Sequence, residues 1–193
     1  MNDNKGVFGP IVRTSFLLML LCGFIYPVAM TGVAQVLMPG KADGSLLYND
    51  EGQEIGAELI GQSFTSEKYF HGRVSSIAYD GAGSGSGNYA PSNEEMIQRT
   101  KDSVAEWGQA NPDTPVSDLP MDLVTNSGSG LDPHISPEGA YAQVPRISEA
   151  TGIDQTDINS LIEKNTQGRE LGLFGEPRVN VLLLNIDLAK MIE

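Results

Sequence analysis

The sequence predicts an α+β protein, in which a single N-terminal transmembrane helix is followed by a mixed α/β extracytoplasmic domain. Three observations lead to this fold class. The stretch from Thr14 to Gly40 contains no Asp, Glu, Lys or Arg. The chain after it mixes short strand-like runs with segments whose apolar residues recur at helical spacing. Its 193 residues allow one membrane span and one domain with a core of its own.

We place the span at residues 14–38. Its apolar centre, Phe16 to Val36, has 21 residues and would extend about 30 Å as a helix, which matches the hydrocarbon thickness of a bilayer. Small and bent positions interrupt it, and such positions let neighbouring helices approach closely. We therefore expect partner helices to bind at four residues: Gly23, Pro27, Thr31 and Gly32.

A cleaved signal peptide is the alternative, because Gly32, Val33 and Ala34 offer small residues at a plausible cleavage spacing. The apolar run is longer than the roughly 7–15 residues of a signal peptide and contains Pro27, which favours a retained helix. Cys22, the only cysteine, follows a bulky leucine and so does not fit a lipoprotein cleavage site.

The charges on either side of the span predict its orientation. Lys5 and Arg13 lie in the N-terminal tail, residues 1–13, against a single acid, Asp3, so we expect this tail to be cytoplasmic. Residues 37–193 carry 10 basic and 24 acidic side chains, a net charge of −14. So acidic a domain, residues 39–193, is expected to face the periplasm and to bind no nucleic acid.

The first part of this domain is expected to hold a hairpin and a loop. Residues 45–48 and 55–60 look like strands joined by a turn at 49–52. Residues 80–89 are mostly glycine and small polar residues, which predicts a flexible loop. Two further strands are predicted at 121–125 and, from the apolar run RVNVLLLNI, at 178–186.

Three helices are predicted from their end signals. Ser92 and Glu95 match a capping box for a helix that ends near residue 108. A second helix runs over residues 136–152 and is interrupted at Pro145. A third begins after Asp154, and its apolar residues Ile158, Leu161 and Ile162 are expected to face the core.

The chain lacks the motifs of an autonomous enzyme. It has no glycine-rich loop that ends in Gly-Lys-Ser or Gly-Lys-Thr, so we expect no ATP hydrolysis by this chain. Its two histidines, His71 and His134, have no metal-ligand spacing, and no metal site is expected. We therefore predict no catalytic residue.

One polar loop is a candidate functional site: Ser127, Gly128, Ser129, Gly130, Asp132 and His134. Ser129, Asp132 and His134 could serve a membrane-tethered extracytoplasmic hydrolase, which is the alternative function. The Gly-x-Ser-x-Gly spacing of a nucleophile elbow is missing, and residues this close in sequence are a weak sign of a triad. A structural turn, with polar side chains bonded to local backbone, is the preferred interpretation.

Many motifs, in order along nearly the whole chain, resemble those of one family, the C subunit of the Kdp potassium-transporting ATPase. They are Tyr26-Pro27, Thr31-Gly32, Ala34-Gln35, Gly44-Ser45-Leu46, Gly56 to Phe64, Tyr69 to Arg73, Ser127 to Pro137, Gln143 to Arg146, Gly168 to Gly172 and Gly175 to Val181. Val74, where a proline usually follows Gly-Arg, and the glycine-rich loop before Pro91 depart from the pattern, and both affect only loops.

The resemblance implies an accessory subunit of a bacterial inner-membrane complex. Its partners would be a potassium-channel-like subunit and a P-type ATPase subunit, which handle potassium and ATP, beside the membrane lipid. It also implies that this subunit raises the ATP affinity of the hydrolysing subunit. Because ATP is cytoplasmic and the acidic domain is expected outside, any such effect would be allosteric.

Two physical roles follow as expectations. The span would hold the complex together through its small and bent positions. The acidic domain would cover the outer mouth of the potassium pathway and raise the local cation concentration within about one Debye length, ~8 Å at physiological salt. The alternative is that the charge only keeps the domain soluble.

Overall fold

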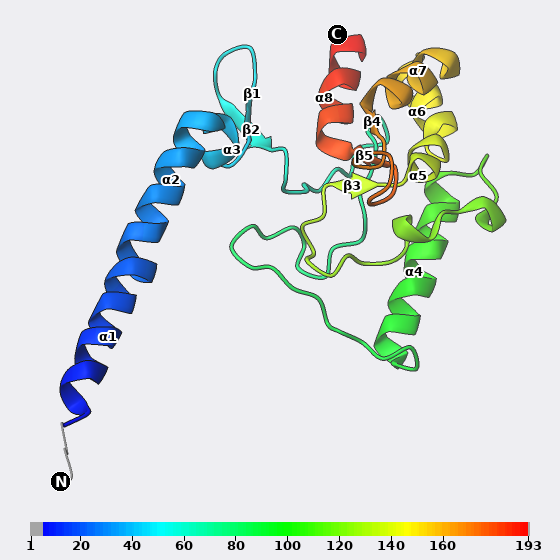
Figure 1. Ribbon diagram of the computed structural model, residues 1–193. Coiled ribbons are helices and arrows are strands. Elements are labelled where there is room, and N and C mark those ends of the chain that lie inside the picture. Colours follow the sequence, from blue (N-terminus) through cyan, green and yellow to red (C-terminus); the bar gives the residue numbers. More distant parts are fainter. Residues whose placement is uncertain (1–5, 193) are drawn as a thin grey trace. The chain divides into compact units, whose positions relative to one another are not determined.

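The computed structural model describes residues 6–192, and its contacts divide the chain into two compact units, residues 1–46 and 47–193. Each unit is described by itself. Figure 1 shows one long helix in the first unit and a mixture of helices and short strands in the second. This confirms the mixed helix-and-strand fold class with one N-terminal apolar helix.

The first unit is built on one long apolar helix, made of α1 (Phe8–Leu20), a π-helical turn η1 (Leu21–Ile25) and α2 (Tyr26–Leu37). By length and composition it is suited to cross a membrane, and none of its side chains is buried. It starts within the tail predicted at residues 1–13, so the helix is longer than the 14–38 span. A short helix, α3 (Pro39–Ala42), follows after Met38, where the backbone is not helical (φ −150°, ψ 62°).

The π-helical turn has a local cause in Pro27. Proline has no N–H, so the carbonyl of Gly23, four residues before it, has no α-helical hydrogen-bond donor. The Tyr26 N–H instead bonds the Leu21 carbonyl, five residues back, which is the π-helical pattern. The helix therefore continues through the proline with a widened turn.

The second unit starts with the predicted hairpin. Strands β1 (Leu46–Tyr48) and β2 (Glu54–Ala57) pair, and Asn49 holds the turn because its side-chain oxygen accepts from the N–H groups of Glu51 (3.1 Å) and Gln53 (2.8 Å). The second strand ends at Ala57, before the predicted residue 60.

A small antiparallel sheet lies in the middle of the unit. Its order is β3 (His134–Ile135), β5 (Arg178–Asn180), β4 (Thr166–Gln167). His134 is paired with Asn180, and Thr166 with Val179. The sheet thereby joins the polar loop before β3 to the C-terminal part of the chain.

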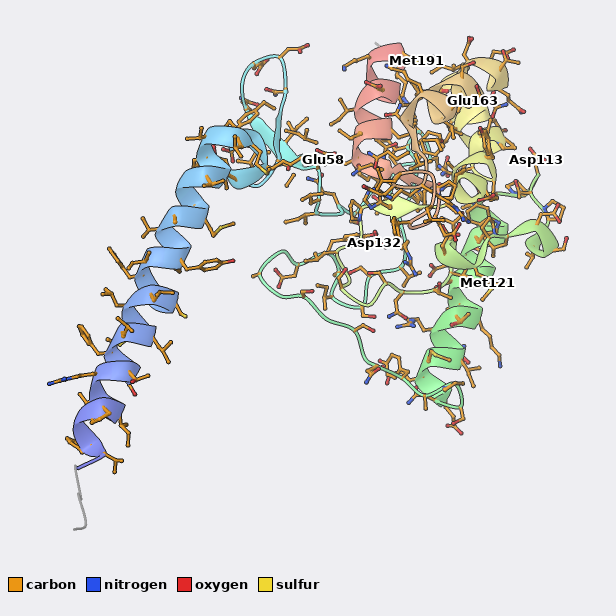
Figure 2. All side chains as sticks on the ribbon, viewed as in Figure 1. Glu58, Asp113, Met121, Asp132, Glu163 and Met191 are labelled. Atoms are coloured by element: carbon orange, nitrogen blue, oxygen red, sulfur yellow. The ribbon has the colours of Figure 1, made fainter. Side chains whose placement is uncertain are left out.

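Helices cover this sheet and form the core with it. They are α4 (Glu94–Ala110), α5 (Pro137–Tyr141), α6 (Val144–Thr151), α7 (Gln155–Asn165) and α8 (Val181–Ile192), with short 3-10 turns η2 (Val116–Asp118) and η3 (Met121–Leu123) between α4 and β3. The buried core includes Phe70, Ile147, Ile158, Val179 and Leu184, each with no exposed surface. Figure 2 shows the side chains that fill the space between these elements.

Two predicted strands are wrong. Only residues 178–180 of the predicted strand 178–186 are extended, and the rest belongs to α8. The apolar run hid a helical repeat, because Val181, Leu184 and Leu188 are buried at spacings of three and four. Asn180 starts this helix by accepting from the Leu183 N–H (3.1 Å). Residues 121–125 contain the turn η3 (Met121–Leu123) and no strand.

The three predicted helices are present, with one correction. Asn93, and not Ser92, caps α4, since its side chain accepts from the Met96 N–H at 2.9 Å. Residues 136–152 form two helices, α5 and α6, with Pro145 in the first turn of the second, where its missing N–H costs nothing. Asp154 caps α7, whose three predicted core residues are buried.

Residues 58–73, which we call the strap, contain neither helix nor strand yet cross the core. Side chains supply the hydrogen bonds that a neighbouring strand would give. Asn185 on α8 accepts from the Phe70 N–H (2.8 Å) and donates to the Phe70 carbonyl (2.9 Å). Gln143 forms the same pair of bonds with the backbone of His71, at 2.8 and 3.2 Å.

A buried arginine completes the attachment of the strap. Arg146 on α6 donates to the carbonyls of Glu67 and Tyr69, and its Nε donates to Asn111 Oδ1 at 3.0 Å. Asn180 donates to the Glu58 carbonyl at the other end of the strap, at 2.6 Å. The strap therefore depends on side chains that come much later in the chain.

The loop predicted at residues 80–89 has no helix or strand, but hydrogen bonds join it to the polar loop before β3. The Gly85 N–H donates to the Ser129 carbonyl at 2.8 Å, and Asn126 Nδ2 donates to Ser86 Oγ at 2.8 Å. The two loops therefore support each other.

Candidate functional site

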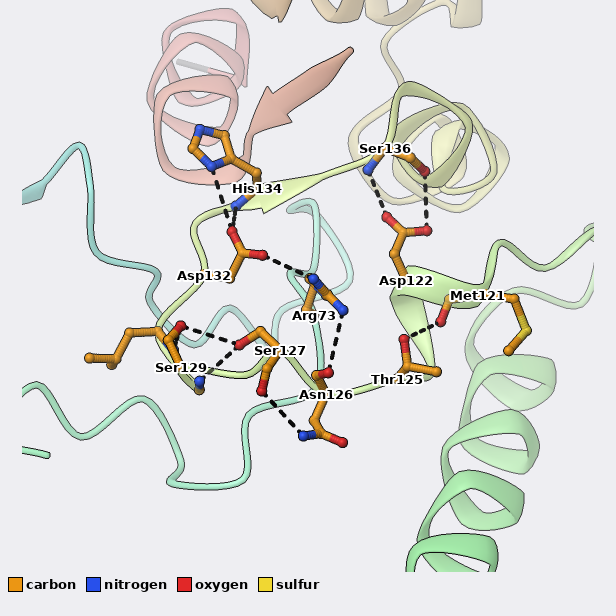
Figure 3. Close-up of polar contacts among 12 residues, drawn as sticks. Arg73, Met121, Asp122, Thr125, Asn126, Ser127, Ser129, Asp132, His134 and Ser136 are labelled. Atoms are coloured by element: carbon orange, nitrogen blue, oxygen red, sulfur yellow. Dashed lines mark hydrogen bonds and ion pairs between the residues drawn. The ribbon is translucent and has the colours of Figure 1, made fainter. Parts of the chain in front are cut away.

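Asp132 is the centre of the candidate polar loop. Arg73 Nη1, from the end of the strap, donates to Asp132 Oδ2 at 3.0 Å, and Arg73 Nη2 donates to the Asn126 carbonyl at 3.3 Å. Asp132 Oδ1 accepts from the backbone N–H of His134 at 3.0 Å, with the ring nitrogen Nδ1 at 3.5 Å. Figure 3 shows this chain of contacts from His134 to Asn126.

These contacts keep Asp132 charged. Burial by itself raises the pKa of this carboxyl, but the hydrogen bonds from His134 and Arg73 and the charge of Arg73 outweigh it and lower the pKa to about 2. The group is thus an anion over the whole physiological range. It is a poor proton donor or acceptor for general acid–base catalysis near neutral pH.

Both serines of the loop serve the backbone. Ser127 Oγ accepts from the Gly130 N–H at 2.8 Å, and Ser129 Oγ accepts from the Leu131 N–H at 3.1 Å. Such bonds are typical of turns formed by serine. They agree with the structural interpretation of this loop.

Gly130 is the residue that the turn requires. Its φ of +70° lies in the left-handed region, and an added Cβ would come within 2.6 Å of Ile77 Cγ1 and 3.0 Å of the Gly85 carbonyl. The Gly130 carbonyl also accepts from Ser75 Oγ at 2.7 Å. Gly128, by contrast, has open space where its Cβ would lie.

The hydrolase alternative requires a serine that contacts the histidine. The described contacts join His134 to Asp132 but place neither serine hydroxyl in hydrogen-bond contact with the His134 ring (Figure 3). Within the described part of the chain the structure therefore brings together two members of the hypothetical triad and leaves Ser129 in a turn.

A shallow groove lies beside Asp132, with a volume of about 550 Å³. Its lining includes the basic residues Arg73 and Arg178, the acidic residues Asp122, Asp132 and Glu176, and His134. Asp122 is already occupied, because it accepts from the backbone and hydroxyl of Ser136, at 2.6 and 3.1 Å. Because Arg73, Arg178 and Glu176 are each in an ion pair, the groove has no strong preference for an anion or a cation.

Among the described residues, no group of three or more His, Cys, Asp or Glu side chains could hold a metal ion. No role was predicted from the sequence for Arg73, Gln143 and Arg146, although all three lie in the motifs quoted for the family. In the structure Arg73 pairs with Asp132, and Gln143 and Arg146 hold the strap through hydrogen bonds to its backbone. These roles follow from contacts in space and not from any spacing in the sequence.

The four span positions share exposure but differ in local geometry. Gly23 lies in the π-helical turn, and Pro27 and Thr31 follow at intervals of four, which places these three on one side of the helix. Gly32 is adjacent to Thr31. An added Cβ at either glycine meets nothing within 4 Å in this chain, so both remain open to a partner.

Comparison with known proteins is consistent along the whole chain. Residues 8–190 match the family model for the c chain of the K⁺-transporting ATPase. The potassium-transporting ATPase KdpC subunits of Bacillus cytotoxicus and Bacillus cereus strain Q1 are 54% and 53% identical to this chain. In both cases the similarity covers 193 residues and 100% of each protein.

Proposed function

The chain belongs to the family of the K⁺-transporting ATPase c chain, and from this premise we propose that it is a non-catalytic accessory subunit of an ATP-driven potassium uptake complex. The observation that carries the proposal is the extent of the match, which includes both the apolar helix and the second unit. Each part therefore has a place in the same assembly.

The partners in this proposal are a channel-like subunit that binds potassium and a P-type ATPase subunit that binds and hydrolyses ATP. The polar loop of this chain supports that division of roles, because its serines and its carboxylate are engaged in structural bonds. Potassium and nucleotide are then handled by the partners, and this chain stabilises their assembly.

The helix Phe8–Leu37 is proposed to anchor the chain in the inner membrane and to bind partner helices. We expect Gly23→Leu or Thr31→Leu to reduce co-elution of the larger subunits in mild detergent, because each adds bulk where helices would approach closely. Val33→Phe adds bulk two residues from Thr31, on a different side of the helix from both Thr31 and Gly32, and is the control. Equal loss in all three variants would contradict a specific docking side.

The acidic second unit is proposed to be periplasmic, with the N-terminus cytoplasmic. Gly83 lies in the 80–89 loop with open space around it, so a Gly83→Cys variant in a Cys22→Ser background is suited to labelling. A reagent that does not cross the membrane should label intact spheroplasts as fully as lysed ones. Labelling only after lysis would overturn the orientation.

The net charge of −14 is proposed to favour potassium entry. Asp50, Glu51, Asp113 and Glu163 are exposed, and changing all four to lysine raises the net charge by eight units. Figure 2 labels Asp113 and Glu163. The variant complex should bind potassium more weakly at low ionic strength and normally at high salt, where screening removes the effect. Unchanged affinity at low salt would leave solubility as the role of the charge.

An effect on ATP affinity is proposed to be allosteric. A coupling of roughly 1–3 kcal/mol would change the ATP affinity of the hydrolysing subunit about 5- to 150-fold. The comparison is between complexes that contain and lack this chain, with the KM for ATP as the readout. Photo-crosslinking of an ATP analogue to this chain would replace the allosteric proposal with direct contact.

A further inference from the structure

A hairpin finger, residues 168–177, connects strands β4 and β5 of the central sheet. Within it, Glu170 and Phe174 form an isolated antiparallel bridge: the N–H of each donates to the carbonyl of the other, at 2.8 and 2.9 Å. The bridge lies beyond the paired residues of β4 and β5 and one position out of their register, and it gives the finger a defined path of its own.

The end of the finger is apolar and exposed. Leu171 is 93% exposed, Leu173 70% and Phe174 60%. Three large apolar residues within four positions are unusual on a free surface, where single apolar residues are the norm. In an otherwise acidic domain they mark a surface that another molecule covers.

Local conformation gives no reason for leucine at the most exposed position. Leu171 has φ +53°, in the left-handed region, where glycine or asparagine would relax the backbone. Burial of the side chain within this chain does not offset the backbone strain, because Leu171 is almost fully exposed. A leucine that is both strained and exposed is explained by a contact outside the chain.

Two ion pairs lie at the base of the finger and neutralise its charge. Arg169 Nη2 pairs with Glu176 Oε2 at 2.6 Å, and Arg178 Nη2 pairs with Glu170 Oε1 at 3.2 Å. The two arginines are therefore balanced by the two glutamates beside them. The finger therefore presents an apolar tip on an electrically neutral base.

The charges and the area decide between three kinds of partner. An anionic lipid surface would repel a domain of net charge −14, and the arginines that could attract it are paired. A second copy of this chain would bring together two domains of the same negative charge, which repel each other. Three apolar side chains also bury far less than the roughly 800 Å² per partner that a stable interface needs. A subunit that the span already holds requires no such area, because its effective concentration is high.

The geometry points to the tip of the finger, Leu171, Leu173 and Phe174, as a docking element that inserts into an apolar, non-acidic recess of a larger membrane subunit of the same complex. This inference rests on the proposed function, since it takes the partner to be a subunit that the span also contacts. It adds a second attachment, formed by the second unit, to the one proposed within the membrane.

The first test changes Leu171, Leu173 and Phe174 to serine in the full-length chain and measures how much of the larger subunits co-elutes. We expect at least a fivefold loss, with the melting temperature of the isolated chain unchanged because these side chains are exposed. The control variant changes two other exposed apolar residues, Val116 and Met121, to serine. The larger subunits should co-elute with it as they do with the unaltered chain. Equal recovery of the finger variant and the control overturns the inference.

A second measurement identifies the partner directly. In a Cys22→Ser background, Leu173→Cys carries a dye whose emission shifts to the blue in apolar surroundings. A shift only in the presence of the larger subunits supports the inference. A shift for the chain alone in lipid nanodiscs assigns the tip to lipid, and a concentration-dependent shift in detergent assigns it to a second copy. No shift in any sample excludes docking. Each of these three results overturns the inference.

The unaltered chain separates this inference from the proposed function. If it fails to co-elute with any larger membrane subunit, the proposed function is wrong and the inference falls with it. If it co-elutes and the finger variant co-elutes equally well, the proposed function stands and only the docking role of the finger is wrong.

Discussion

Replacing Asn185 by leucine should destabilise the second unit strongly. Asn185 is buried, and its amide both donates to and accepts from the backbone of Phe70, which has no exposed surface. Leucine has the same number and branching of side-chain heavy atoms but forms neither bond, so the N–H and carbonyl of Phe70 would stay buried without a partner. Each such group costs about 1–3 kcal/mol, which gives about 2–6 kcal/mol in total. This is a large part of the roughly 5–15 kcal/mol that stabilises a typical domain.

Trp107, the only tryptophan, is buried in the same core, and its fluorescence follows unfolding of the full-length chain in detergent. A loss of about 3 kcal/mol would lower the melting temperature by roughly 6–12 °C. Gln109→Leu, an amide-to-leucine change at an exposed position of α4, is the matched control and should shift it little. If Asn185→Leu changes stability by less than about 0.5 kcal/mol, the strap is not held as described.

Three further predictions concern the polar loop and the core. Asp132→Asn removes an ion pair that is partly exposed to solvent, so we expect a loss of about 1 kcal/mol at neutral pH. Because the pKa of Asp132 is lowered to about 2 from 3.8, its contribution to stability is present above pH 4 and is lost as the pH falls towards 2. Denaturant titrations of wild type and variant measure this, and a difference in unfolding free energy that stays constant over this pH range would contradict it. Gly130→Ala should cost about 1–3 kcal/mol, since it adds a Cβ at φ +70° against Ile77, whereas Gly128→Ala should be nearly neutral; equal melting temperatures would show that the turn is not constrained. Leu184→Ala should cost about 2–5 kcal/mol in the same unfolding assay, because Leu184 is fully buried, and a loss below 1 kcal/mol would place it outside the core.

The parts of the fold that sequence patterns predicted are those governed by local rules. The apolar helix follows from a long stretch without charges, and the start of α7 follows from Asp154. The break at Pro145 follows from its missing N–H. In each case the residue acts on its immediate neighbours, so no knowledge of distant contacts is needed.

The parts that were wrong or missed depend on distant contacts or on a choice between two periods. The run at 181–184 is apolar on consecutive positions, which fits a buried strand or a buried helix equally, and only the burial of Leu184 and Leu188 decides for a helix. For the candidate loop, residues 127–134 were identified, but Arg73, the partner of Asp132, lies 59 positions earlier. No local pattern predicts that pair.

The strap also has a consequence for the order in which the chain matures during synthesis. The groups that secure Phe70 belong to Asn185 on α8, which lies 115 positions later. While the ribosome is still making the last helix, the strap has nothing to bind, and its apolar residues stay uncovered. A nascent chain that stops short of α8 therefore exposes a segment on which proteases and chaperones can act, and a chain that includes α8 conceals it.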